Sequence, residues 1–337
     1  MDEYEGKPLA YLDHNILDRF LKNDLQDLKK RLIEDYQIVY SDENLKEIHR
    51  SGEFASEFIK VLEDINAKHI QIVFKHPGFI ETDKAYLRTC NVNDAMNEYL
   101  ANTSGYNGIM DAMLQSNLKY HGGEVDKSFS EINENFVIEF NRLLEQIRLD
   151  VKSLNGIASA DLKQYFDLIG ILGNKFEDII KENERLKNPL TGQGKNWNPM
   201  KDFRTEMKLG PLQLNNIRGP KILEQIWDQY KDKQPYETGF TIDKFFGLEK
   251  HPIYQNREYF MHQKITTAYN ILNTIGYYSD SKTHLNKKFV SFMSDTNHAT
   301  MACFCATLFS GDERLAKKAS AIYEYLGLGI KVELIKM

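Results

Sequence analysis

The sequence predicts a mixed α/β protein in which both ends of the chain build one domain around a central parallel sheet. Short apolar segments alternate with amphipathic segments over residues 1–78 and again over 281–337. Strands that alternate with helices imply crossover connections and therefore a parallel sheet. Residues 79–280 instead show long helical periodicities. We expect a discontinuous α/β domain, 1–78 with 281–337, interrupted by a large, mostly α-helical insertion over 79–280.

The N-terminal part of this domain should alternate strands with helices. Its expected strands are short runs of apolar, β-branched or aromatic residues, and its expected helices repeat apolar residues every three or four positions. The strands are 8–13, 36–40 and 69–74, and the helices are 16–21, 25–33, the segment after Ser41, and 54–66. Ser41 suits a helix cap because its hydroxyl can accept from backbone N–H groups of the first turn.

The middle and the C-terminal part differ in pattern. Candidate helices of the middle are 83–101, 106–118, 128–153, 159–185, 219–231 and 258–275, with a Gly-, Pro- and Asn-rich loop at 188–199. This loop lacks the spacing of a phosphate-binding loop, so we predict no nucleotide site there. The aromatic and basic residues of 254–264 suit either base stacking or helix packing. After 280 we expect helices at 289–305 and 314–326, a buried strand at 307–309, and an edge strand at 330–335.

Composition narrows the class of protein. The 337 residues, 42% of them hydrophobic, can form one large domain or two. A net charge of −6 argues against a basic coat that binds nucleic acid non-specifically, although it permits a local basic groove. Cys90, Cys303 and Cys305 form no disulfide framework or zinc motif. No apolar run approaches the ~18 residues of a membrane span, so we expect no membrane partner and a cytoplasmic location.

Four acidic residues mark the places where strands meet helices. They are Asp13, Glu47, Asp295 and Asp312. In an open parallel sheet, the carboxyl ends of the strands converge on one crevice where the strand order reverses. Clustered carboxylates need a counter-charge, and hard divalent ions such as Mg²⁺ or Mn²⁺ prefer oxygen ligands. Two ions about 3.5–4 Å apart could activate a water and stabilise the leaving oxygen of a phosphodiester. The alternative is that these acids are helix caps and surface charges.

Several neighbouring residues have two interpretations each. Asn15 either orients Asp13 or caps the first helix. His298, one helical turn after the third acid, either hydrogen-bonds a carboxylate or phosphate or is a satisfied core histidine. Asp42 and Glu43 could replace Glu47 if their helix begins elsewhere.

A basic cluster adjoins the last acid, Asp312. Its members are Arg314, Lys317 and Lys318. Lysines and arginines at this position could hold substrate phosphates. A solvated helix face, which is the more frequent arrangement of such charges, would explain them equally well.

The acidic segments resemble those of PIN-domain nucleases. In that family the first strand ends in Asp followed two residues later by Asn, as Asp13 and Asn15 do here. A Ser then begins a helix that carries a conserved Glu, the position of Glu47. Asp295-Thr296-Asn297-His298-Ala299 and Ser310-Gly311-Asp312 are similar to the third and fourth motifs, with Ser310 where many members have Thr. The resemblance covers about residues 8–76 and 285–337; the long insertion departs from the compact family fold.

This resemblance implies a PIN-like α/β/α sandwich and a metal-dependent endonuclease. The metal ligands it implies are Asp13, Glu47, Asp295 and Asp312, with Asn15 and His298 as further catalytic residues and Mg²⁺ or Mn²⁺ as the cofactor. The implied substrate is nucleic acid, RNA more often than DNA. A role as a toxin or defence effector, a protein inhibitor and a homo-oligomer are further implications.

Two other functions compete with the nuclease. A catalytically silent PIN-like scaffold would bind nucleic acid or protein through the insertion, although all four acids are retained. An aspartyl-phosphate phosphatase also begins with an Asp after its first strand. It requires a second acid two residues later, where this chain has Asn15, and another a helical turn after the late Gly-Asp pair, where it has Ala316. The sequence therefore favours the nuclease.

Overall fold

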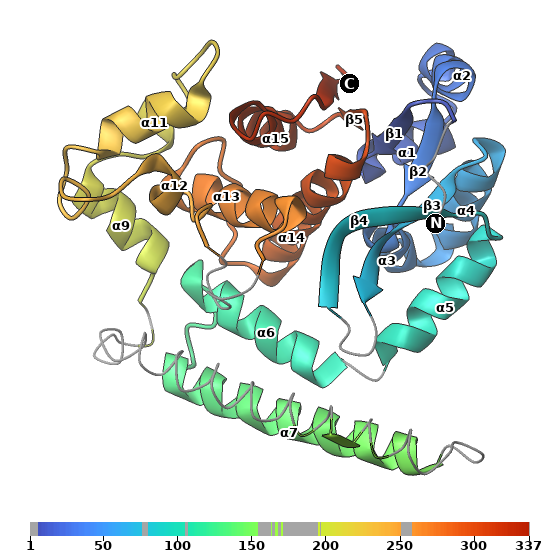
Figure 1. The fold of residues 1–337 in the computed structure, drawn as a ribbon, viewed down its shortest axis with the longest axis horizontal. Helices are drawn as coiled ribbons and strands as arrows, with labels where there is room; N and C mark the ends of the chain where they lie inside the picture. Colours follow the sequence, from blue (N-terminus) through green and yellow to red (C-terminus); the bar gives the residue numbers. More distant parts are fainter. Residues whose placement is uncertain are drawn as a thin grey trace. The chain divides into compact units, whose positions relative to one another are not determined.

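The protein has a mixed α/β fold built on one six-stranded sheet (Figure 1). The computed structural model describes residues 6–75, 80–104, 107–153, 163, 166–167, 170, 195, 197–250 and 258–336. The strands are β1 (Leu9–Leu12), β2 (Gln37–Tyr40), β3 (Lys68–Lys75), β4 (Ile80–Arg88), β5 (Thr307–Ser310) and β6 (Lys331–Leu334). Their order is β4-β3-β2-β1-β5-β6, and all neighbours are parallel except β3 and β4. The five strands expected from sequence are confirmed, including β6 at an edge.

The two ends of the chain meet in the middle of this sheet. Tyr11 of β1 pairs with Val39 of β2 on one side and with Leu308 of β5 on the other. In Figure 1 the N-terminal strands, in blue, accordingly lie beside the C-terminal β5, in red. The chain thus leaves β1 toward β2 and later returns on its opposite side at β5. This is the reversal of strand order at which α/β proteins open a crevice.

The central strands are buried on both faces. Ala10 and Tyr11 of β1 and Leu308 and Phe309 of β5 are each 0% exposed. Apolar residues at successive positions are typical of parallel strands that helices cover on both sides. The edge strand β6 instead has an exposed residue at each end and two half-buried residues between them. The apolar core therefore lies directly beneath the carboxyl ends of β1 and β5.

Helices connect and cover the strands. They are α1 (His14–Leu21), α2 (Gln26–Asp35), α3 (Asp42–Arg50), α4 (Ala55–Asp64), α5 (Val92–Ser104), α6 (Asn107–Tyr120), α7 (Phe129–Ser153), α9 (Pro199–Met207), α10 (Pro211–Leu214), α11 (Ile222–Tyr230), α12 (Ile242–Phe245), α13 (Met261–Ile275), α14 (Asn286–Met301) and α15 (Glu313–Tyr325), with 3₁₀ turns at Gly52–Phe54 and Ala302–Phe304. The predicted helix at 159–185 and the predicted loop at 188–199 lie mostly outside the described residues.

The predicted helix over 83–101 is wrong in its first part. Residues 80–88 form β4, antiparallel to β3, and the helix begins at Val92. Contacts with β3 stabilise the extended form: the Tyr86 hydroxyl donates to Gln71 Oε1 at 2.6 Å, and the Thr82 hydroxyl donates to the Val73 carbonyl at 2.8 Å. Pairing with a neighbouring strand therefore outweighed the local helical pattern.

The chain forms two compact units. The first comprises Met1–Tyr99, Phe203–Ser281 and Val290–Met337, and the second comprises Leu100–Asp202 and Lys282–Phe289. Residues 79–99 and 203–280, which we expected in the insertion, thus lie in the same unit as the sheet. In the second unit α6 packs against α7, and Leu144 of α7 packs against Phe140 and Ile147 of the same helix. The predicted domains, 1–78 with 281–337 and 79–280, stay a prediction.

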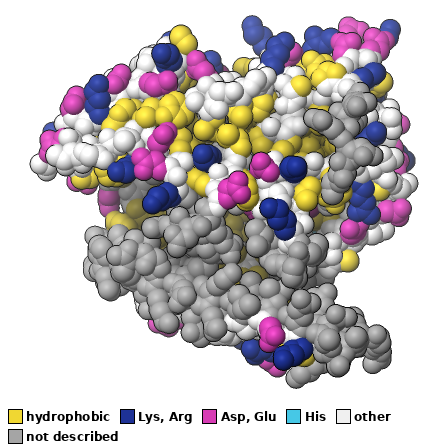
Figure 2. All heavy atoms as spheres, viewed as in Figure 1, with side chains coloured by type: hydrophobic (Ala, Val, Ile, Leu, Met, Phe, Trp, Pro, Cys, Tyr) yellow, Lys and Arg dark blue, Asp and Glu magenta, His cyan; other side chains and the backbone are white. Residues whose placement is uncertain are grey.

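Charges of both signs share the described surface. Figure 2 shows Lys and Arg side chains interspersed with Asp and Glu over the described residues of one face. This mixture agrees with the modest net charge of −6. Among the described helices, none has the length and apolar character needed to cross a membrane.

Candidate functional site

Asp13 lies at the carboxyl end of β1 and faces the end of β5. It occupies the N-cap position of α1, yet its side chain caps no backbone N–H group of that helix. Its Oδ2 instead accepts a hydrogen bond from the Ser310 hydroxyl at 2.6 Å and another from the Asn15 amide. Asp13 is only 3% exposed. The interpretation of Asp13 as a helix cap is therefore wrong.

Asn15 orients Asp13 and joins the ends of two strands. Its Nδ2 donates to Asp13, and its Oδ1 accepts from the Gly311 backbone N–H at 2.8 Å. Both polar ends of the amide are thus used between β1 and β5. Of its two interpretations, orientation of the carboxylate is the one that the contacts support.

Helix α3 brings Glu47 to the same place. Ser41 caps this helix as predicted, because its hydroxyl accepts from the Glu43 N–H at 3.3 Å. Asn44 completes a capping box by accepting from the Ser41 N–H at 2.9 Å, and its Nδ2 donates to the Leu12 carbonyl at 3.1 Å. The first turn of α3 is thereby fastened to the end of β1, and Glu47 follows one turn later.

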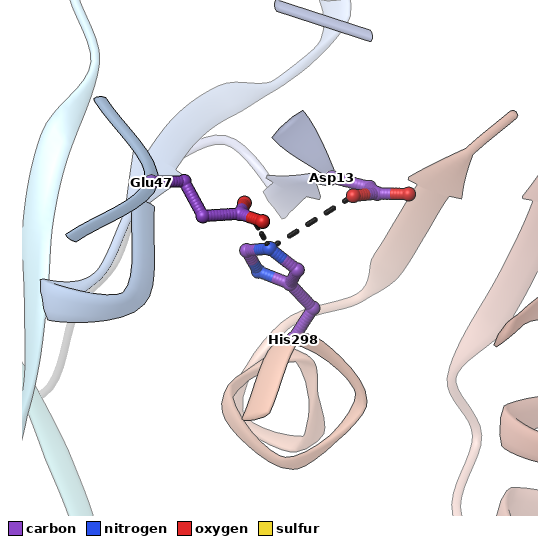
Figure 3. Close-up of side chains that lie close together, drawn as sticks. All are labelled: Asp13, Glu47 and His298. Atoms are coloured by element: carbon purple, nitrogen blue, oxygen red, sulfur yellow. Dashed lines mark hydrogen bonds and ion pairs between the residues drawn. The ribbon is translucent and has the colours of Figure 1, made fainter. Parts of the chain in front are cut away.

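His298 of α14 stands between the two carboxylates (Figure 3). Its Nε2 lies 2.7 Å from Glu47 Oε2 and 3.8 Å from Asp13 Oδ1. On the other side of the ring, Nδ1 is 3.0 Å from the Tyr11 hydroxyl, which is itself 2.6 Å from Ser41 Oγ. The imidazole is 0% exposed. Both interpretations of His298 thus hold together: it is a buried core histidine, and it contacts the candidate metal ligands.

The charges of these groups are strongly coupled. Burial by itself would lower the pKa of His298, but Glu47 and then Asp13 raise this pKa to about 9. Burial would likewise raise the pKa of Glu47, but the neighbouring His298 lowers it to about 2. The pKa of Asp13 is raised, because burial outweighs the favourable contacts with His298 and Ser310. Without an ion, an imidazolium therefore neutralises part of the acidic charge.

The donor set fits a divalent ion. Asp13, Glu47 and His298 each offer one ligand atom, and these atoms lie within 4.8 Å of one another. Within the described residues, no other three His, Cys, Asp or Glu side chains are grouped in this way. Two carboxylate oxygens and one imidazole nitrogen are common ligands of first-row divalent ions. The Tyr11 hydroxyl also contacts Nδ1, the other ring nitrogen of His298. Polar groups usually hold this second nitrogen in metal-binding histidines.

Asp295 and Asp312 lie near this group, but neither belongs to it. The surroundings of these two acids also differ. Asp312 caps α15, since its Oδ1 accepts from the Arg314 and Leu315 N–H groups at 2.6 and 3.1 Å. Its charge nevertheless contributes to the raised pKa values of Asp13 and Asp295. Asp295, one turn before His298 on α14, has its pKa raised well above the ordinary value by burial and then by Asp13. The cap interpretation therefore holds for Asp312.

Glu43 has a role other than replacing Glu47. It is 8% exposed and accepts from the Ser294 hydroxyl at 2.6 Å and from Asn297 Nδ2 at 2.7 Å. Glu43 thus links α3 to α14. The other alternative, Asp42, lies 2.8 Å from His69 Nε2. Glu47 is therefore the acid of α3 that reaches the candidate metal ligands.

The basic cluster is divided between surface and core. Lys317 lines a cavity of about 190 Å³ with Arg218 and Tyr278, and Arg314 lies 3.8 Å from Asp280. Lys318 is 0% exposed, and its Nζ donates to Asp280 Oδ2 at 2.6 Å. A solvated helix face is thus the wrong interpretation for Lys318.

Sequence reasoning missed Asp280 and the buried position of Lys318. The sequence held a signal for the lysine, because positions 315, 319 and 322 carry the apolar face of α15 and position 318 falls on that face. It held no comparable signal for Asp280, which lies in a connection between two helices.

The comparison with protein-family models, the comparison with curated proteins and the comparison with solved structures each found no match for this chain.

Proposed function

We propose that this chain is a PIN-like, metal-dependent endonuclease that hydrolyses phosphodiester bonds, in RNA more readily than in DNA. The observation that supports this most directly is the convergence of Asp13, Glu47 and His298 within 4.8 Å. They come from β1, α3 and α14, and β1 is the strand at which the order reverses. Ligands of open α/β sheets bind at such positions. The preference for RNA and a role as a toxin or defence effector rest on the sequence resemblance alone.

The proposed cofactor is Mg²⁺ or Mn²⁺, held by Asp13, Glu47 and His298. When bound, such an ion supplies a Lewis acid that polarises the phosphate and lowers the pKa of water. Ser310 and Asn15 both hold Oδ2 of Asp13, while Oδ1 is the atom nearest His298. Because these contacts exist before any ion arrives, Asp13 is already oriented. His298, which is held as an imidazolium beside Glu47, would have to lose its proton to offer Nε2 as a ligand.

Asp295 is the proposed group that positions the attacking water. Its pKa is raised by burial and by the charges of Asp13, Asp280 and Asp312. A carboxylate with a raised pKa accepts a proton more readily near neutral pH than an ordinary one. Asp312, whose Oδ1 is used by the first turn of α15, contributes negative charge close by.

Cleavage assays test the proposal. The purified chain is incubated with labelled single-stranded RNA or DNA in Mg²⁺, in Mn²⁺ or in chelator. We expect cleavage of RNA with either ion, none in chelator, and a loss of at least about 100-fold in Asp13→Asn, the usual order for a key electrostatic group. Asp64→Asn is the matched control because its side chain is 66% exposed. Equal cleavage by Asp13→Asn and the wild type, or no cleavage of either nucleic acid, would refute the proposal.

A further inference from the structure

A small cavity lies beside α15, and none of the residues that line it belongs to the candidate metal centre. Its volume is about 190 Å³, which is below the roughly 300–1,000 Å³ of pockets for drug-sized ligands. Its walls come from the connection between α10 and α11, from the residues after α13 and from α15, and they include residues 217–219, Tyr277, Tyr278, Lys317, Ser320 and Glu324. Arg218 and Glu324 are exposed, so the cavity opens to solvent. Its size suits one small chemical group.

Lys317 contributes a positive charge to this cavity. Helix α15 carries three cations, and two of them approach Asp280: Arg314 at 3.8 Å and Lys318 at 2.6 Å. Lys317 instead lines the cavity, with its Nζ 5.9 Å from the centre of the Tyr278 ring. No carboxylate of the described residues forms an ion pair with Lys317. The ammonium of Lys317 is therefore available to a ligand in the cavity.

Arg218 supplies a second positive charge from a different part of the chain. Its Nη1 donates to the Asn215 carbonyl and, at 2.9 Å, to the Ile217 carbonyl, so the side chain is held against its own connection. Within the described part of the chain, no carboxylate pairs with this guanidinium. Glu324 also lines the cavity, and its Oε1 accepts from the Lys221 backbone N–H at 3.0 Å. Two cations and one acid give these walls a net positive charge.

Tyr277 brings a hydroxyl that the fold leaves unused. The residue is 2% exposed and lines the cavity. Among the described residues, its hydroxyl has no hydrogen-bond partner. Burial, and then the neighbouring Tyr278, raises the pKa of Tyr277 to about 12, so the hydroxyl keeps its proton near neutral pH. Because polar groups in buried side chains are normally hydrogen-bonded, this hydroxyl is suited to donate to an acceptor oxygen of a ligand.

The connection after α13 has an unusual backbone conformation. Tyr278 has a φ of +42°, in the left-handed region that residues other than glycine rarely adopt. Its backbone N–H donates to Asn215 Oδ1 at 2.7 Å, which ties this connection to the one that carries Arg218. Strained backbone persists where surrounding contacts enforce it, and it is frequent at ligand sites. Specific contacts within the first compact unit therefore shape the walls of the cavity.

We propose that this cavity binds a phosphate group, with Arg218 and Lys317 as counter-charges and the Tyr277 hydroxyl as a further donor. Charge-assisted hydrogen bonds from arginine and lysine are the usual means of holding phosphate. The group is either free phosphate or the terminal phosphate of a nucleic-acid strand, since both present the same oxygens to the cavity. The site shares no residue with the proposed metal centre, so its failure would leave the proposed function unchanged.

Calorimetric titrations in chelator test this inference without involving the metal centre. The full-length chain is titrated with inorganic phosphate and with short single-stranded DNA, with and without a terminal phosphate. We expect binding of inorganic phosphate or of the phosphorylated strand, and weaker binding of the strand without that phosphate. Tighter binding of the phosphorylated strand than of inorganic phosphate identifies a strand end as the ligand, and the reverse order identifies free phosphate. A wild type that binds neither phosphate-bearing probe would overturn the inference.

Substitutions in the wall locate the site. Arg218→Gln and Lys317→Gln should each weaken phosphate binding at least about tenfold, because each removes a charge-assisted contact. Glu324→Gln removes the opposing charge and should tighten binding. Lys30→Gln, whose side chain is 78% exposed on α2, is the matched control and should bind like the wild type. Unchanged affinity in both Arg218→Gln and Lys317→Gln would show that phosphate binds elsewhere.

The hydroxyl of Tyr277 supplies a separate measurement. Tyr277→Phe should weaken phosphate binding while leaving the midpoint of thermal unfolding without phosphate unchanged, because the hydroxyl has no partner among the described residues. A folded Tyr277→Phe that binds phosphate like the wild type would contradict the inference. If Tyr277→Phe does not fold, the affinity of Lys317→Gln decides, since Lys317 is partly exposed.

Discussion

Single residues of the candidate site differ in how their charges affect folding. Asp295 has its pKa raised by burial and by neighbouring carboxylates, so ionising it costs more in the folded chain than in the unfolded chain. Glu47 has its pKa lowered to about 2 by His298, so its ionised form is favoured by folding. Groups whose environment opposes their ordinary ionisation are frequent in functional sites. Because the pKa shifts of Asp295 and Glu47 have opposite directions, they give two separate predictions.

The first prediction is that Asp295→Asn stabilises the protein in the absence of ions. Because the folded pKa is raised, the cost is absent below the ordinary value of 3.8 and grows as the pH rises toward the folded pKa. Denaturant titrations in chelator at pH 7 should show a gain of about 0.5–2 kcal/mol in the free energy of unfolding. The gain should disappear near pH 3.5.

A control separates this effect from a general change in surface charge. Asp18→Asn removes an acid of α1 that pairs with Lys22 at 2.6 Å on the surface, and its effect should stay within about 0.5 kcal/mol. If Asp295→Asn instead destabilised the chain at pH 7, Asp295 would be a structural residue.

The second prediction concerns the pair of His298 and Glu47, also in chelator. The raised pKa of His298, about 9, contributes stability that is complete below pH 6.5 and is lost as the pH rises through 9. The lowered pKa of Glu47, about 2, contributes stability that is complete above pH 4.5 and is lost as the pH falls toward 2. The difference in the free energy of unfolding between the wild type and His298→Gln should therefore be greatest at about pH 4.5–6.5.

The size of this difference has an upper bound. One pKa unit corresponds to about 1.4 kcal/mol, which limits the loss between pH 6.5 and pH 9 to about 3 kcal/mol. Because both shifts report the same ion pair, their energies are not added. Urea titrations at several pH values measure the difference. Parallel curves for the wild type and His298→Gln across this range would show that the imidazole carries no charge in the folded protein.

At the scale of secondary-structure elements, α3 carries the connection between the sheet and α14. Its cap, Ser41, accepts from the helix and also lies 2.6 Å from the Tyr11 hydroxyl, which contacts His298. Further along, Glu43 binds two side chains of α14. The geometry of Glu47 therefore depends on how α3 begins.

The third prediction is that Ser41→Ala weakens both the fold and the metal centre. Loss of an N-cap typically costs about 0.5–2 kcal/mol, and the Tyr11 hydroxyl loses a partner as well. Calorimetry should show weaker Mn²⁺ binding together with the loss of stability. Thr241→Ala is the control, because Thr241 caps α12 through the Lys244 N–H; it should lower stability without changing Mn²⁺ affinity. Unchanged affinity in Ser41→Ala would argue against the coupling of α3 to the ion.

At the scale of the whole molecule, the candidate site exists because distant parts of the chain fold together. Asp13 and Ser310, which share a hydrogen bond, are 297 positions apart in sequence, and Glu47 and His298 are 251 apart. Closing such long loops costs conformational entropy before any contact compensates for it. An ion that binds residues from both ends should therefore stabilise the folded state and leave the unfolded chain unaffected.

The fourth prediction follows from this linkage. Mn²⁺ should raise the midpoint of thermal unfolding progressively with concentration, by an amount equivalent to about 2.7 kcal/mol at 100 times the dissociation constant. Differential scanning calorimetry with and without chelator measures the shift. Asp13→Asn should show little or none of it. An equal shift in Asp13→Asn would place the ion elsewhere on the chain.

Much of the sheet and part of the site could be predicted from sequence. Strands β1, β2, β3, β5 and β6 follow from short apolar runs, and the Ser41 cap follows from its position before a helix. Strand β4 could not be predicted, because its extended form depends on pairing with β3. The sequence predicted that Glu47 lies on a helix near the crevice. It did not identify His298 as the partner of Glu47.

By itself, the sequence determined where most of the strands and helices form and which acids follow them, because hydrophobic periodicity and capping are local properties. Only the tertiary structure decided what each acid does. Asp13 accepts from Ser310 instead of capping α1, Asp312 caps α15, and Glu43 binds α14. It also decided that Lys318 is buried against Asp280. The physical reason is that the energy of a charge depends on its burial and its neighbours, and here those neighbours come from distant parts of the chain.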